Sequence, residues 1–337
     1  MQTDICIIGA GPVGIFTIFQ AGMLGMKSCV IDALSFPGGQ CSALYPEKPI
    51  YDIPAYSKIT GQNLIENLLT QAKPFNPTFF LNSKAISVNE DKNSGFKVTA
   101  KCGDVNKQIY AKVIVIAGGS GFFGPNKPPL DGMEKFENTQ VLYFIDKLAR
   151  FKDKNVVIAG GGDSAVDWAI SLVGIAKSVN IVHRRADFRC MPESQKQLEK
   201  LSKEGLVRIF TPYKLEKIID NNNIITGLVV QNIENLKNIN IETDYLLPFF
   251  GLKTELGEIA NWGLKLEKKL IKVDHASMQT SKIGIYAIGD MCSYEGKLKL
   301  ILSGFYESAT AVHNAYNVVF PDKPLHFEHS TSKAGSF

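Results

Sequence analysis

Two glycine-rich stretches carry the residue types and spacing most suggestive of chemistry in this sequence. Glycines at this spacing let the backbone turn tightly, and they let the free N–H groups of a helix start approach a pyrophosphate. Both stretches therefore predict dinucleotide binding. The first contains Gly9, Gly11, Pro12 and Gly14, and the second contains Gly160, Gly162, Asp163, Ser164 and Ala165.

The residues that follow each stretch distinguish the two predicted ligands. Asp32 follows the first, and a carboxylate there can accept hydrogen bonds from an adenosine ribose. His183, Arg184 and Arg185 follow the second, where the planar guanidinium matches the geometry of a phosphate. We therefore expect NADP in the second site. The alternatives are a tight turn with incidental glycines and a solvated basic turn.

The flanking sequence supplies the strands and helices that the motif requires. Residues 5–8 and 28–31 are short apolar runs typical of buried parallel strands, and the sequence between them has helical periodicity after Pro12. Residues 156–159 and 179–182 repeat this pattern around the second stretch. Each glycine turn is thus predicted to join a strand to a helix.

Further elements complete the predicted organisation. Asp290 ends a strand-like run and is a candidate ligand for sugar-alcohol hydroxyls. Residues 79–81, 85–88 and 96–100 suggest a small antiparallel excursion, and 117–121 suggest a domain junction. The other expectations are helices over 60–72, 194–203 and 304–319, a buried strand over 113–116, and a hairpin of 215–219 with 224–230.

Composition describes a globular chain of ordinary character. The 337 residues are enough for two domains, and the formal charge of +4 is too mild to predict nucleic-acid binding. The six cysteines include no C-x-x-C pair, which favours a reducing, cytoplasmic setting. No signal peptide, membrane span or metal site is expected. Lys297 and Lys299 are predicted to lie on solvated surface, and the alternative is that they form a docking patch for an acidic protein.

Taken together, these motifs resemble the low-molecular-weight thioredoxin reductase family along nearly the whole chain. That family carries a redox C-x-x-C just before its second glycine motif, whereas residues 141–146 here read Val-Leu-Tyr-Phe-Ile-Asp. Disulfide reduction by that route is therefore excluded. The sequence is closer to the disulfide-free branch, the thioredoxin reductase-like ferredoxin–NADP⁺ reductases. The stretches that resemble this branch are 38–40, 45–52, 117–121 and 329–332.

The resemblance implies an α/β protein with two Rossmann-like (three-layer ββα) domains, the NADP domain being inserted into the FAD domain. The implied boundaries are 1–117 and 251–337 for FAD and 118–250 for NADP(H). Tyr45 and His329 would stack on the two faces of the flavin, with no obligatory acid or base. Asp146 is interpreted as structural. The further implied FAD contacts are Gly39, Gln40, Gly289, Asp290 and Thr331.

The implied activity passes electrons between NADP(H) and ferredoxin or flavodoxin. A homodimer is also implied, in which the C-terminal extension covers the partner's flavin. One alternative is a disulfide-free diaphorase or quinone reductase. Another is a nucleotide-binding sensor without turnover, which the two intact phosphate turns disfavour.

Overall fold

The computed structural model describes residues 1–119 and 121–325. It divides into two compact units: unit 1 comprises residues 1–122 and 254–337, and unit 2 comprises residues 123–253. Unit 2 is therefore inserted in the sequence of unit 1. The chain crosses between them on β9 (Phe122–Pro125) and β17 (Leu252–Glu255), which pair as a two-stranded sheet.

Unit 1 is built on a seven-stranded sheet whose core is parallel. Strands β5, β2, β1 and β8 follow one another across it in parallel. Strand β8 also pairs with β20 in parallel and with β7 in antiparallel orientation, and β6 follows β7 as a further antiparallel strand. The strands are β1 (Gln2–Ile8), β2 (Ser28–Ile31), β5 (Thr78–Phe80), β6 (Lys84–Asp91), β7 (Gly95–Cys102), β8 (Val105–Ile116) and β20 (Ile285–Ala287).

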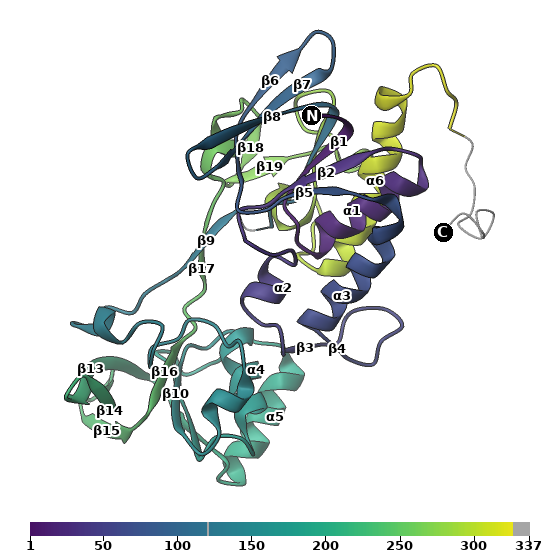
Figure 1. Cartoon of the computed structure of the whole chain (residues 1–337). Helices are drawn as coiled ribbons and strands as arrows, with labels where there is room; N and C mark the ends of the chain where they lie inside the picture. Colours follow the sequence, from purple (N-terminus) through teal and green to yellow (C-terminus); the bar gives the residue numbers. More distant parts are fainter. Residues whose placement is uncertain (120, 326–337) are drawn as a thin grey trace. The chain divides into compact units, whose positions relative to one another are not determined.

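Three helices cover one face of this sheet (Figure 1). They are α1 (Pro12–Met23), α3 (Gly61–Ala72) and α6 (Ile301–Val319). Thr60 caps α3 by accepting a hydrogen bond from the Asn63 N–H at 3.2 Å. The smaller elements are α2 (Gln40–Ala43), the pair β3 (Pro49–Ile50) and β4 (Ile59–Thr60), and the sheet of β18 (Leu266–Glu267), β19 (Leu270–Lys272) and β21 (Cys292–Ser293).

Two local expectations for unit 1 are corrected. The strand near Phe79 does not belong to an antiparallel excursion, because β5 pairs parallel with β2 at the edge of the main sheet. Helix α6 begins at Ile301, earlier than expected. Gly304 lies inside the helix, where an added Cβ would overlap Val13, so this glycine serves close helix packing and does not start the helix.

Unit 2 has its own parallel sheet, in the order β12-β11-β10-β16. Val157 and Ala159 of this sheet share a core with Ile218, Leu228 and Val230 of a second, antiparallel sheet. The parallel strands are β10 (Asn155–Ala159), β11 (Ser178–Val182), β12 (Val207–Phe210) and β16 (Tyr245–Pro248). The antiparallel strands are β13 (Tyr213–Asn221), β14 (Ile224–Asn232) and β15 (Asn238–Glu242), and the helices are α4 (Asp163–Leu172) and α5 (Pro192–Lys203).

Both units therefore place a glycine turn after the central strand of a parallel sheet, as predicted. The predicted hairpin is β13 and β14, whose turn residues Asn222 and Asn223 both have positive φ. Within the part of the chain that the structure describes, none of the helices has both the length and the apolar character required to cross a membrane.

Candidate functional site

The first glycine turn is fixed by close backbone approach at two of its three positions. A Cβ on Gly9 would overlap the Ala117 carbonyl oxygen, and one on Gly14 would overlap the Gly9 carbonyl oxygen. At Gly11, by contrast, no described atom lies within 4 Å of the Cβ position. Gly11 precedes α1 and supplies no side chain to cap it. The start of α1 thus has no side-chain cap, which leaves its leading N–H groups available to a bound phosphate.

Asp32 ties the glycine turn to the end of β2. Its carboxylate accepts hydrogen bonds from the Ala10 N–H at 2.6 Å and the Leu34 N–H at 2.8 Å. Burial raises the pKa of Asp32, and these two N–H groups act in the opposite direction. Each carboxylate oxygen can accept a second hydrogen bond, so Asp32 can still receive a ribose hydroxyl.

The loop before α2 packs directly on the same turn. The Gly38 N–H donates to the Ala10 carbonyl at 2.7 Å. Gly39 has φ +55°, and its Cβ position lies 3.0 Å from the Gly11 Cα. The Gln40 Nε2 lies 3.8 Å from the Cβ position of Gly119, in the segment that follows β8. The residues predicted at 39 and 40 therefore lie beside the glycine turn.

Tyr45 and Asp290 lie close enough for their charges to interact. Burial raises the pKa of the Tyr45 phenol well above its ordinary value, and the neighbouring Cys41 and the Asp290 carboxylate raise it further. The Cys41 thiol donates to the Tyr45 oxygen at 3.6 Å, and burial raises its own pKa to about 11. Tyr45 is thus a neutral, partly buried ring near Asp290.

All these segments gather at the carboxyl edge of one parallel sheet. The glycine turn follows β1, Asp32 follows β2, Ala117 follows β8, and Gly289 follows β20. Open α/β sheets bind ligands at this edge. The described part of unit 1 therefore assembles a single candidate site from the predicted residues. His329 and Thr331 lie outside the described residues.

The second glycine turn repeats this construction in unit 2. Gly160 has φ +150°, and a Cβ there would be 2.5 Å from the Phe249 carbonyl oxygen. Gly162 precedes α4 without a side-chain cap from the described residues. Ala165 is fully buried beneath the turn. Ser164 is exposed in the first turn of α4, where it can reach a ligand.

Asp163 and His183 have local packing partners. The Asp163 carboxylate accepts a hydrogen bond from the Met191 N–H at 2.8 Å, so it anchors the 189–191 segment. The His183 ring lies against Gly161, where an added Cβ would overlap it, and it stacks on Phe188 at 5.5 Å. Burial lowers the pKa of His183, and the nearby arginine charges lower it further.

The arginines are placed to meet an anion. Arg184 and Arg185 are exposed directly after β11, at the edge where the glycine turn lies. The sequence reasoning missed a third, Arg189, whose N–H donates to the Gly161 carbonyl at 2.6 Å. Arg189 also pairs with Gly162 as an isolated bridge. The sequence signal for Arg189 is its position shortly after Arg184 and Arg185, in the same segment that follows the second strand.

The segment before the second turn carries an aromatic residue in a polar cluster. The Tyr143 hydroxyl donates to Glu137 at 2.6 Å, and Glu137 pairs with Lys127 at 2.7 Å. Burial and this hydrogen bond raise the pKa of Tyr143. Asp146 pairs with Arg150 at 3.6 Å, which gives it a local structural contact. The cysteines at 6, 29, 41, 102, 190 and 292 are free.

Comparison with known sequences identifies the family. A model of the pyridine nucleotide-disulphide oxidoreductase family matches residues 3–317. The chain belongs to that family. A relative from Anaplasma marginale (strain St. Maries), named ferredoxin–NADP reductase, is 50% identical over 98% of this chain and 99% of its own length. One of the same name from Rickettsia rickettsii (strain Iowa) is 52% identical over 98% and 96%.

Solved structures of two thioredoxin reductases confirm the fold. Thioredoxin reductase from T. acidophilum superposes with a TM-score of 0.80 at 23% identity, covering 94% of this chain and 98% of its own. The Lactococcus lactis thioredoxin reductase in its FR conformation gives 0.78 at 23% identity, covering 95% and 99%. The predicted α/β architecture with Rossmann-like units and the predicted family resemblance are thereby confirmed.

The two roles of glycine in the first turn can be separated by mutation. Gly14→Ala should destabilise the protein by about 1–3 kcal/mol, because the new methyl group overlaps the backbone of Gly9. Gly11→Ala should change stability by less than about 0.5 kcal/mol, since the site is open. Thermal unfolding of the two variants beside the wild type checks this, and equal midpoints for both would contradict the packing argument.

Proposed function

We propose that this chain is an NADPH-dependent flavoprotein reductase that passes electrons between NADP(H) and ferredoxin, using FAD. The observation that carries the proposal is the sequence identity of 50% and 52%, over 98% of this chain, with two relatives named ferredoxin–NADP reductase. Both glycine turns on which such an enzyme depends are intact in this chain. We extend the proposal to flavodoxin as an acceptor and to a homodimer in the cytoplasm.

The first site suits FAD. The open turn at Gly11 would receive the pyrophosphate, Asp32 the ribose, and Asp290 the polyol hydroxyls. Tyr45 would pack on the isoalloxazine, and its neutral phenol avoids placing a charge there. When bound, FAD accepts a hydride from NADPH and yields electrons one at a time, which suits a one-electron protein acceptor.

The second site suits NADP(H). The N–H groups at the start of α4 would hold the pyrophosphate, while Arg184 and Arg185 would bind the 2′-phosphate. Arg189 adds positive charge beside the same turn. His183 would act by supporting the turn beneath Gly161. We assign the NADP role to unit 2 and the FAD role to unit 1.

The direct test is electron transfer through an added carrier. The purified chain, supplied with NADPH, cytochrome c and ferredoxin from the same organism, should reduce the cytochrome at a rate that depends on the ferredoxin. The matched control omits only the ferredoxin. Equal rates with and without it would instead indicate a diaphorase, and a colourless protein without turnover would indicate a nucleotide-binding sensor.

Arginine substitution tests the assignment of the second site. Arg184→Ala should lower the NADPH-to-NADH ratio of kcat/KM by about 10- to 100-fold, because charge-assisted hydrogen bonds to the 2′-phosphate are lost. Arg208→Ala removes an exposed arginine from β12 of the same unit and should leave the ratio unchanged. An unaltered ratio in Arg184→Ala would contradict the assignment.

The proposed stacking of His329 has an optical readout. His329→Ala should shift the visible absorption of the bound flavin and alter kcat, because the ring would no longer cover the isoalloxazine. His313→Ala is the control, since the His313 ring nitrogen bonds the Ala309 carbonyl within α6 at 2.8 Å. An unchanged spectrum together with unchanged kinetics in His329→Ala would refute the stacking.

A further inference from the structure

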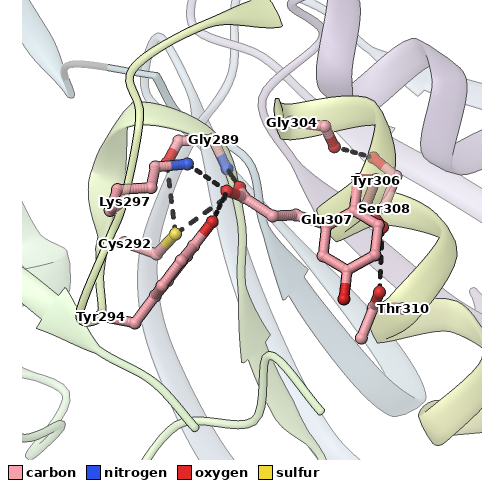
Figure 2. A network of polar contacts seen from close by, with 9 residues as sticks. All are labelled: Gly289, Cys292, Tyr294, Lys297, Gly304, Tyr306, Glu307, Ser308 and Thr310. Atoms are coloured by element: carbon pink, nitrogen blue, oxygen red, sulfur yellow. Dashed lines mark hydrogen bonds and ion pairs between the residues drawn. The ribbon is translucent and has the colours of Figure 1, made fainter. Parts of the chain in front are cut away.

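Glu307 is a fully buried carboxylate in the second turn of α6. Burying a charged group is costly unless it is paired and hydrogen-bonded. Figure 2 shows three donors converging on it. The Gly289 N–H and the Tyr294 hydroxyl each donate at 2.7 Å, and the Lys297 ammonium forms an ion pair with it. The Lys297 side chain is only 7% exposed, which corrects the expectation of solvated surface.

The thiol of Cys292 closes this network. It donates to the Gly289 carbonyl at 3.2 Å and lies 3.6 Å from the Glu307 carboxylate. Burial, followed by the charge of Glu307, raises the pKa of Cys292 to about 12, so the group remains a thiol donor. The segment from Gly289 to Lys297 is therefore wrapped around one carboxylate (Figure 2).

The next residue of α6 contacts the other ligand turn. The Ser308 hydroxyl lies 2.9 Å from the Gly304 carbonyl and 3.2 Å from the Val13 carbonyl, and it accepts a hydrogen bond from the Thr17 hydroxyl at 3.1 Å. Val13 belongs to the first turn of α1, directly behind Gly11. It also fills the space where a Cβ of Gly304 would lie. Helix α6 is thus in contact with the start of α1 and with the Gly289 turn at once.

We propose that Glu307 is a positioning residue for the flavin: by accepting the Gly289 N–H it sets the Gly289–Asp290 turn at a fixed distance from the Gly11 turn, while Lys297 keeps its buried charge paired. The inference rests on the proposed function, which assigns both turns to FAD. An apolar residue at 307 could fill the space but could not accept the Gly289 N–H. A directional acceptor therefore specifies where Asp290 lies relative to the phosphate turn.

Removing and then rebalancing the charge tests the proposal. Lys297→Met leaves the Glu307 carboxylate buried without its cation, and the Kd for FAD should rise about tenfold. The double variant Lys297→Met/Glu307→Gln keeps an acceptor for the Gly289 N–H without an unpaired charge, so it should return to within about threefold of wild type. Lys299→Met, at an exposed lysine two residues further on, should leave the Kd unchanged.

Three measurements on the full-length holoenzyme separate positioning from stability alone. They are the FAD Kd by serial dilution and ultrafiltration, the unfolding midpoint by circular dichroism, and the visible spectrum of bound flavin. Positioning predicts a raised Kd and an altered spectrum in Lys297→Met, with recovery of both in the double variant. A lowered midpoint with unchanged Kd and spectrum would overturn the proposal.

A second variant covers the case in which Lys297→Met fails to fold. Tyr294→Phe removes one donor to Glu307 with little change of volume, and it should raise the FAD Kd about threefold. An unchanged Kd and spectrum in Tyr294→Phe would also overturn the proposal. Failure of the FAD assignment, on which the proposal rests, has a different signature, because the wild-type chain would then not retain FAD at all.

Discussion

The close approach of backbone segments at the first glycine turn is the constraint on which the rest of the site depends. Helix α1 must begin directly at the end of β1, and this requires the missing side chains of Gly9 and Gly14. Both of those Cβ positions are occupied by backbone, whereas among the described residues the Cβ position of Gly11 is open. The loop at Gly39, the Asp32 carboxylate and the start of α6 all pack around that fixed object.

The same strand–glycine turn–helix geometry occurs in both units, but the charged side chains at the carboxyl edge of the sheet differ between them. The edge in unit 1 carries the carboxylates of Asp32 and Asp290, whereas the edge in unit 2 carries Arg184, Arg185 and Arg189. Helix N-termini attract phosphates in either case. We therefore propose that discrimination between the two dinucleotides comes from the residues that follow the second strand of each unit, since the two glycine turns are built alike.

Much of this arrangement could be predicted because parallel strands are buried on both faces and leave short apolar runs in the sequence. Residues 5–8 and 156–159 are of this kind, and both are strands followed by glycine turns. The partner of a strand is not locally encoded, which is why β5 was assigned to the wrong part of the sheet. The pair of Lys297 and Glu307 was missed for a related reason, because lysine in a polar stretch ordinarily indicates solvent and only the fold turns it inward.

The crossings between the units have a consequence for how this architecture can vary. The Asn126 N–H donates to the Gly251 carbonyl at 3.0 Å, so the chain enters and leaves unit 2 through segments that are hydrogen-bonded to each other. An inserted domain whose two ends lie close together can be replaced by a homologous domain without distorting the domain that carries it. On the proposed assignment of NADP(H) to unit 2 and FAD to unit 1, coenzyme preference could therefore be transplanted between relatives on a single continuous segment, while unit 1 keeps its own sheet and helices.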